Sequence, residues 1–328
     1  MKKLVLFFVA LLCGTVFLSG CSETKDLVFI APDGGTLLPP AQLFCDAPVV
    51  QGYRIKGEAV SGTAVEARLF NETCDAAIAP INLCAKVYNT NKSYVLAGVI
   101  AWGNNYIIST SGETPESLTD LYGEVIYAFG GAAVPGVTLK TVLTDNEIAF
   151  SEITAPEEAT ADDKVYLLFL ADPASVLAQV NRPGSTVKYA YLPEPTVTAI
   201  TSAGVRKVAF DVQALWAEQN DGQRYPQAGL MIRKALLTSN PEAAAAFLEK
   251  MEESAAFCLA NPQETARLAK EELQSAALPE IAMTQKYIEG NGKTIMKYGS
   301  TKDETVKTEV VAYLKVIMGA EPAAEFFY

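Results

Sequence analysis

The sequence predicts an α/β fold of two lobes, each with a mixed, mainly parallel sheet. Short apolar runs of strand length recur along the chain, and most lead through a glycine or proline turn into a helical pattern. This alternation of strand, turn and helix is typical of parallel sheets covered by helices. The length of 328 residues corresponds to about two domains of ordinary size.

The first block covers residues 26–109 and begins with an apolar run, a turn over 32–36 and a helical segment over 37–45. Its strand-like runs are 27–31, 53–55, 76–79, 95–100 and 106–109. A second block of the same kind covers 110–203. Its strand-like runs are 123–129, 150–153, 165–170 and 187–192, with a helix expected over 137–145.

The chain changes character beyond residue 204. Two strand-like runs, 205–212 and 228–232, precede helical patterns over 241–277, 280–289 and 305–318. One α/β unit that is interrupted by a second and then resumed is the layout of a two-lobed clamp. We therefore expect lobe 1 to comprise 26–109 and 204–328, lobe 2 to comprise 110–203, and a double-strand hinge to lie near 107–110 and 203–208.

Composition excludes several functional classes. The chain has no histidine, so catalytic Ser-His-Asp and Cys-His arrangements are ruled out, and the commonest ligand of catalytic zinc is missing. The formal net charge is -12 and the chain has no basic stripe, whereas nucleic-acid binding depends on clustered lysine and arginine. We expect no nucleic-acid partner and no bound metal.

The N-terminus is typical of an export signal. Lys2 and Lys3 precede an apolar run over 4–17, and Leu18-Ser19-Gly20-Cys21 follows. Small residues before a cysteine resemble the lipobox of bacterial lipoproteins, in which the thiol receives diacylglycerol before cleavage. We expect 1–20 to be a signal peptide, Cys21 to be lipidated and 21–25 to form a tether. An uncleaved membrane anchor is the alternative, but it needs about 20 apolar residues.

Four cysteines follow the signal, namely Cys45, Cys74, Cys84 and Cys258. An exported protein can pair its cysteines, but their spacing matches neither CxxC nor a metal-binding repeat. Burial as small apolar residues is the alternative. The sequence assigns no disulfide, and Cys74 with Cys84 is the pair to test first.

Several local strings carry a family resemblance. They are 75–82 (DAAIAPIN), 102–106 (WGNNY), 121–123 (LYG), 191–195 (YLPEP) and 225–227 (YPQ). Together with the lipobox and the two-lobed pattern, they resemble the solute-binding lipoproteins of ABC importers, in particular the nitrate, sulfonate, taurine and thiamine-precursor type. The likeness extends over nearly the whole exported chain, but it points to no subgroup of known ligand.

This resemblance implies a type II periplasmic-binding-protein fold, in which loops at the carboxyl ends of parallel strands hold a ligand between the lobes. Helix N-termini at such loops present free N–H groups and a partial positive charge. The candidate loops are Gly34-Gly35-Thr36 in lobe 1 and Gly130-Gly131-Ala132 in lobe 2. Each can instead be a plain tight turn, and neither has a nucleotide-binding glycine pattern.

Four side chains are further candidates for ligand contact. Asn82 offers an amide, or it caps the helix that follows. Trp102 and Tyr106 bracket a polar turn and offer flat apolar surface, with core burial as the common alternative, and we assign Phe129 to the core. Glu194 can face a cationic group of the ligand, or it supports the first turn of a helix. The candidate loops contain no lysine or arginine, so an anionic ligand would rely on helix N-termini and side-chain donors.

The expected function is that of a binding protein, not an enzyme. We expect an extracytoplasmic, lipid-anchored receptor that captures a small-molecule solute and delivers it to an ABC permease driven by a cytoplasmic ATPase. It needs no cofactor, and it meets the membrane through its lipid. The alternatives are a ligand-sensing subunit of a membrane receptor and, less favoured, an enzyme on the same fold. For an enzyme, the acidic pairs Asp162-Asp163 and Glu157-Glu158 lie in polar stretches that we expect to be solvated.

Overall fold

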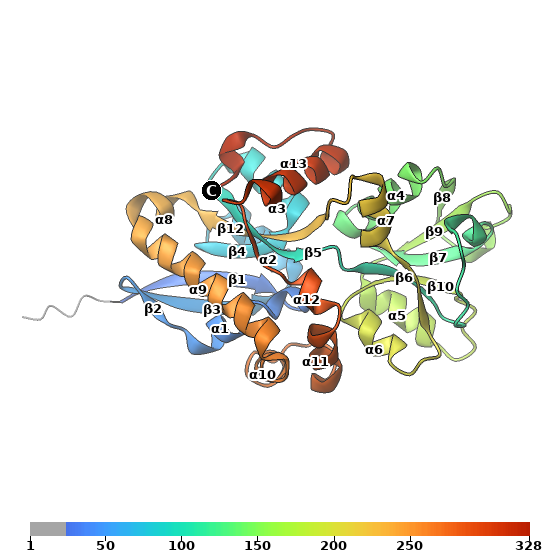
Figure 1. Cartoon of the computed structure of the whole chain (residues 1–328), viewed down its shortest axis with the longest axis horizontal. Coiled ribbons are helices and arrows are strands. Elements are labelled where there is room, and N and C mark those ends of the chain that lie inside the picture. Colours follow the sequence, from blue (N-terminus) through green and yellow to red (C-terminus); the bar gives the residue numbers. More distant parts are fainter. Residues whose placement is uncertain (1–23) are drawn as a thin grey trace, which may run out of the picture.

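Two sheets lie side by side along the long axis of the molecule, each flanked by helices (Figure 1). The computed structural model describes residues 24–328. The expected signal peptide 1–20 and the lipidation site Cys21 lie outside the described residues. Two mixed sheets covered by helices confirm the predicted α/β class.

The first sheet contains β1 (Lys25–Pro32), β2 (Val49–Val50), β3 (Tyr53–Val60), β4 (Ala76–Pro80), β5 (Tyr94–Trp102), β12 (Pro226–Arg233) and β13 (Gly299–Ser300). Their order is β13-β5-β12-β4-β1-β3-β2. β1 runs parallel to β3 and β4, whereas β12 runs antiparallel to β4 and β5. The chain returns from the second lobe along β12 and enters at the carboxyl ends of β4 and β5. This sheet therefore has less parallel pairing than expected.

The second sheet contains β6 (Asn105–Ser109), β7 (Val125–Phe129), β8 (Phe150–Ile153), β9 (Val165–Leu170), β10 (Tyr189–Pro193) and β11 (Lys207–Asp211). Their order is β11-β6-β10-β7-β9-β8. Strands β10, β7, β9 and β8 are parallel neighbours, while β6 runs antiparallel to both β10 and β11. The parallel part of this sheet carries the carboxyl-end loops that the sequence predicts.

Helices cover the faces of both sheets. Around the second sheet they are α4 (Val134–Asp145), α5 (Pro173–Asn181), α6 (Thr196–Thr201) and α7 (Val212–Gln219). Around the first they are α1 (Ala41–Asp46), α2 (Gly62–Phe70), α3 (Ile81–Asn91), α8 (Lys234–Ser239), α9 (Pro241–Ala260), α10 (Pro262–Arg267), α11 (Ile281–Glu289), α12 (Gly292–Ile295) and α13 (Glu304–Met318). The helical pattern expected over 241–277 is divided after Ala260, because Pro262 cannot continue a helix and starts a new one.

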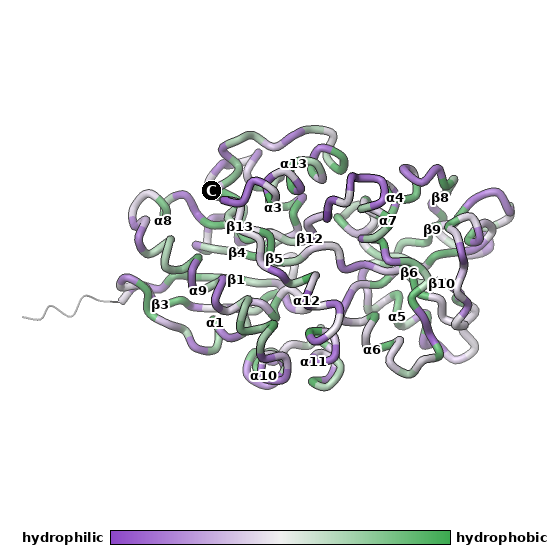
Figure 2. The backbone as a smooth tube through the Cα atoms, viewed as in Figure 1, coloured by the Kyte–Doolittle hydropathy of each residue, from purple (hydrophilic) through white to green (hydrophobic). Residues whose placement is uncertain are grey.

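The core follows the strands. Every residue of β5 is buried, and so are the first four residues of β4, because helices cover both faces of the sheet. Figure 2 shows hydrophobic residues along the strands of both sheets and hydrophilic residues in the outer loops. Within residues 24–328, no helix is both long and apolar enough to cross a bilayer.

The chain passes between the two sheets at two short segments. Gly103 and Asn104 connect β5 to β6, and residues 220–225 connect α7 to β12. The crossings expected near 107–110 and 203–208 instead fall at β6 and β11, which pair with each other inside the second sheet. The sheet boundaries therefore differ by several residues from the lobe boundaries expected at 109/110 and 203/204.

Candidate functional site

A cavity of about 580 Å³ lies where the loops of the two lobes meet. The first lobe lines it with the loop after β1 and the ends of β4 and β5, and the second lobe with the loops after β9 and β10. The closing segment of the chain adds Ala276, Ala277, Tyr287, Ile295 and Met296. Small-molecule pockets have volumes of roughly 300–1,000 Å³, so the cavity is of suitable size for one small ligand.

The glycine loop after β1 forms one wall, and Gly34, Gly35 and Thr36 all line the cavity. Gly34 has φ 125°, a backbone conformation that favours glycine. A Cβ on Gly35 would lie 3.5 Å from the carbonyl oxygen of Glu194, so the space between the two lobes at this point is about that of one methyl group. Asp33 fixes the loop, because its carboxylate accepts hydrogen bonds from the Ser275 hydroxyl and from the backbone N–H groups of 276 and 277.

Glu194 lines the cavity from the second lobe, directly after β10, and its side chain is 2% exposed. Its carboxylate accepts hydrogen bonds from the backbone N–H and the hydroxyl of Thr198, both at 2.9 Å, and from Nδ2 of Asn291 at 2.8 Å. Burial, with a smaller contribution from Asp211, raises the pKa of Glu194. Both roles expected for this residue are therefore compatible, since it supports the first turn of α6 and faces the cavity.

Two adjacent asparagines at the β5–β6 crossing also line the cavity. Asn105 is 1% exposed, and its Nδ2 donates to the Tyr225 hydroxyl and to Oε1 of Gln227, both at 3.4 Å. Among residues 24–328, no donor pairs with Oδ1 of Asn104 or Oδ1 of Asn105, although both atoms are buried. A buried acceptor without a partner costs about 1–3 kcal/mol, so these two oxygens are unsatisfied acceptors beside the cavity.

Charge in the cavity has a single sign. Asp33, Asp172 and Glu194 line it, and no lysine or arginine of the described chain does. Asp172 lies at the N-terminus of α5, where its Oδ1 accepts from the backbone N–H of Ser175 at 2.7 Å. This hydrogen bond lowers the pKa of Asp172.

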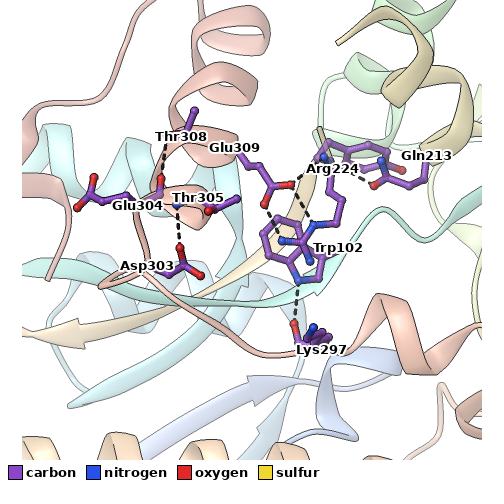
Figure 3. A network of polar contacts seen from close by, with 10 residues as sticks. Trp102, Gln213, Arg224, Lys297, Asp303, Glu304, Thr305, Thr308 and Glu309 are labelled. Atoms are coloured by element: carbon purple, nitrogen blue, oxygen red, sulfur yellow. Dashed lines mark hydrogen bonds and ion pairs between the residues drawn. The ribbon is translucent and has the colours of Figure 1, made fainter. Parts of the chain in front are cut away.

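The structure places Trp102 outside the cavity lining, in contrast to the prediction. Its ring is 2% exposed, and its Nε1 donates to the carbonyl oxygen of Lys297 at 2.8 Å. The guanidinium of Arg224 lies 3.6 Å from the ring centroid and is also bonded to Glu309, as Figure 3 shows. At the end of β5 the side chain points away from the cavity, and the polar turn beside it supplies the asparagines instead.

Tyr106, Asn82 and the second glycine loop, which were also predicted, do not line the cavity either. Tyr106 is buried on β6, and Oδ1 of Asn82 accepts from the backbone N–H of Leu83 in the first turn of α3. The loop Gly130-Gly131-Ala132 turns the chain into α4: the Gly130 carbonyl accepts from the N–H groups of Ala133 and Gly136. A Cβ on Gly131 would lie 2.9 Å from the Phe169 ring, so close packing explains that glycine.

Some lining residues were not among the predicted ones. Phe129, assigned to the core, stacks on Tyr191 with ring centroids 5.6 Å apart and also lines the cavity. The tandem asparagines after a long apolar strand were a usable signal, because polar pairs at strand ends often face a cleft. Tyr287 and Met296 come from helices distant in sequence and have no comparable local signal.

In the described part of the chain, Cys45, Cys74, Cys84 and Cys258 are all free thiols, so the candidate pair Cys74 and Cys84 is not bonded. Burial raises the pKa of Cys84 and of Cys258 to about 12, which keeps both as neutral core residues. Residues 24–328 also contain no group of three or more acidic or cysteine side chains placed to hold a metal.

No protein-family model and no curated protein sequence matches the chain. Solved structures do. An ABC transporter protein from Parabacteroides distasonis has a TM-score of 0.70 at 18% identity, over 93% of this chain and 99% of its own. The aliphatic sulphonate binding protein SsuA from Escherichia coli has a TM-score of 0.66 at 12% identity, over 93% and 92%. The alkanesulfonate-binding protein SsuA from Xanthomonas axonopodis pv. citri has a TM-score of 0.64 at 12% identity, over 93% and 99%.

These likenesses establish the fold. The chain has the two-lobed architecture of ABC transporter solute-binding proteins of the type II periplasmic class, as the resemblance implied.

Proposed function

We propose that the protein is the extracytoplasmic solute-binding component of an ABC importer. The observation that carries the proposal is the cavity of about 580 Å³ lined by strand-end loops of both lobes. The solved structures of the same fold include an ABC transporter protein and two sulfonate-binding proteins, which supports a role in solute capture. The bound solute would pass to a membrane permease driven by a cytoplasmic ATPase.

Capture requires the lobes to part and close again. Glu194 of the second lobe accepts a hydrogen bond from Nδ2 of Asn291 at 2.8 Å, beside the first lobe, so the described conformation is a closed one. The chain crosses between the sheets at Gly103-Asn104 and at 220–225, and these short segments are the natural hinge. A solute that contacts both lobes would stabilise the closed form through its higher affinity for that form.

Binding without catalysis is consistent with the lining. The carboxylate of Glu194 is held by three neutral donors, and Asp33 is bound to the segment after α10. The acidic pairs Asp162-Asp163 and Glu157-Glu158 are exposed and lie outside the cavity lining. An enzyme would need a positioned acid and base within reach of one substrate atom.

A lipid on Cys21 would hold the receptor at the outer side of the bacterial membrane. The short stretch between Cys21 and the start of β1 at Lys25 would then be the tether. A tethered receptor stays close to its permease, which raises the effective concentration of one for the other.

A thermal-shift screen of the exported protein against small solutes tests this proposal. A ligand at about 100 times its Kd adds roughly 2.7 kcal/mol to the unfolding free energy, so at least one solute should raise the Tm clearly. Ala277→Trp places an indole at the cavity wall and should abolish the shift, while the matched change Ala320→Trp at an exposed residue outside the lining should not.

Uptake then separates transport from sensing. Deletion of the protein should stop uptake of the labelled solute identified in the screen. Normal uptake with a lost transcriptional or signalling response would favour the sensing subunit. The proposed function predicts at least one solute that raises the Tm of the wild type but not the Tm of the Ala277→Trp variant. A screen that finds no such solute would contradict it.

A further inference from the structure

The charge of the cavity bears on the class of solute. Glu194 is almost fully buried, and all the donors to its carboxylate are neutral. Among the described residues, neither Glu194, Asp33 nor Asp172 forms an ion pair with lysine or arginine. A buried carboxylate without a cationic partner is costly, and a cationic ligand would supply that partner.

The N-termini of α5 and α6 at the cavity do not offset this negative charge. The start of α5 is capped by Asp172, and the first turn of α6 donates to Glu194. Free N–H groups and the positive end of the helix dipole are what an anion would use, and here the chain's own carboxylates already occupy both positions. A sulfonate entering this cavity would meet two carboxylates at the places where it needs donors.

Two buried side-chain atoms of the cavity lining lack partners in the described chain, and both are acceptors. Nδ2 of Asn105 is engaged with Tyr225 and Gln227, and the buried Oδ1 atoms of Asn104 and Asn105 have no donor within residues 24–328. A ligand that satisfies these atoms must bring N–H or O–H groups.

Most of the other lining residues are apolar, apart from Thr36, Thr196 and Gln227. Phe129, Tyr287, Ile295 and Met296 contribute side chains, and three proline-containing strand ends complete the walls. An aromatic face attracts a cation as well as an apolar body. The ligand that fits this lining has a compact apolar part and one donor-rich, positively charged group.

We infer that the cavity binds a small organic cation, an amine or amidine with an apolar body, whose N–H groups are held by Glu194 and the oxygens of Asn104 and Asn105. This inference rests on the proposed function and specifies its solute class. It separates this chain from the sulfonate-binding proteins that share its fold.

Calorimetry with matched probes tests the inference. The exported protein is titrated at pH 7.5 with benzamidine, phenethylamine and cyclohexylamine, and with benzenesulfonate, phenylethanesulfonate and cyclohexanesulfonate as anions of the same body. The tightest binder should be a cation, and its affinity should fall with added salt. A sulfonate as the tightest binder, or no binding of any cation, would overturn the inference.

Variants locate the effect. Glu194→Gln should lower the affinity for the tightest-binding cation roughly tenfold, since a hydrogen bond to a charged group is lost. Asp172→Asn keeps the helix cap and removes only the charge, so it should weaken binding about threefold. Glu325→Gln removes an exposed charge away from the lining and should leave the affinity unchanged. Equal affinity for the cation in all three variants would also overturn the inference.

The experiments distinguish a failure of the proposed solute-binding function from a failure of the inferred cationic solute class. If a sulfonate binds tightly and Ala277→Trp abolishes that binding, the proposed solute-binding function is retained and the inference of a cationic solute is rejected. The Tm of each unliganded variant, measured beside the wild type, shows whether a lost affinity reflects a lost fold.

Discussion

Glu194 and Asn291 form a hydrogen bond of 2.8 Å between the two lobes. Glu194 follows β10 of the second sheet, and Asn291 lies between α11 and α12 beside the first. The bond links a buried carboxylate of the cavity to an exposed residue on the opposite lobe. It therefore connects the closed arrangement of the lobes directly to the site.

Asn291→Ala should favour the open form. The variant removes the Nδ2 donor of Asn291, while the N–H and the hydroxyl of Thr198 still donate to the Glu194 carboxylate. A hydrogen bond to a charged group contributes roughly 1.5–3 kcal/mol, so ligand affinity should fall about tenfold or more. Small-angle scattering should show a larger radius for the unliganded variant than for the wild type. Gln285→Ala, which removes an amide bonded to Glu289 of the same helix, is the control and should change neither quantity.

Stability should depend on pH through Glu194. Burial raises the pKa of Glu194 above its ordinary 4.5, so the folded protein holds this proton more tightly than the unfolded chain does. The stabilisation is fully present below the unfolded pKa and is lost as the pH rises through the folded pKa. The groups that face this carboxyl are Thr198, Asn291, Asp211, Tyr106 and Tyr287.

The pKa of Asp211 is also raised, so Asp211 contributes a pH dependence of the same sign. Because Asp211 is present in both the wild type and Glu194→Gln, the difference between the two proteins isolates the contribution of Glu194. Urea unfolding from pH 4 to pH 8 should show the wild type losing free energy of unfolding relative to Glu194→Gln as the pH rises. A difference that stays constant, or that grows in favour of the wild type, would contradict the assigned pKa direction.

Much of the fold can be predicted from the sequence, because its strands are long apolar runs that end at glycine, proline or polar turns. The glycine loop 34–36 and Glu194, which the sequence offers as ligand contacts, line the cavity for the same reason: each follows a strand whose carboxyl end faces the other lobe. Strand ends are a local signal, and the cavity is built from strand ends.

The other residues of the cavity lining cannot be predicted from local sequence patterns. Trp102 ends β5 and Asn105 begins β6, and only the structure shows that the first is buried outside the cavity lining and the second lines the cavity. Phe129 is apolar at the end of a buried strand, where core and cavity positions have the same sequence pattern. Met296 reaches the cavity only through the packing of α11 and α12 against the first lobe.

Cys21→Ser should prevent lipidation. Without the thiol, diacylglycerol cannot be attached, so the protein should appear as an uncleaved precursor or in the soluble fraction. Mass spectrometry of the exported protein and membrane fractionation measure both effects. An unchanged mass together with unchanged membrane association would remove the lipoprotein proposal and leave the binding function untouched.

Arg224→Lys should loosen the junction of the two crossing segments. Arg224 lies on the return crossing, and its guanidinium both covers Trp102 and pairs with Glu309 through Nε and Nη2 at 3.0 and 2.6 Å (Figure 3). Lysine keeps the charge but cannot form the two-pronged pair or stack as a plane. We expect a loss of about 1–2 kcal/mol in unfolding free energy, measured by urea unfolding. Lys250→Arg, at an exposed pair on α9, is the control and should be neutral.

Trp102→Ala should reduce stability and leave affinity intact. The ring is buried under Arg224, its Nε1 is bonded to the Lys297 carbonyl, and it does not line the cavity. Removing a buried aromatic side chain costs about 3–5 kcal/mol, so the Tm should fall sharply. Calorimetry on the folded fraction at low temperature should give the wild-type Kd for the best ligand of the screen. A Kd raised tenfold with a nearly unchanged Tm would instead place Trp102 at the ligand, as the sequence first predicted.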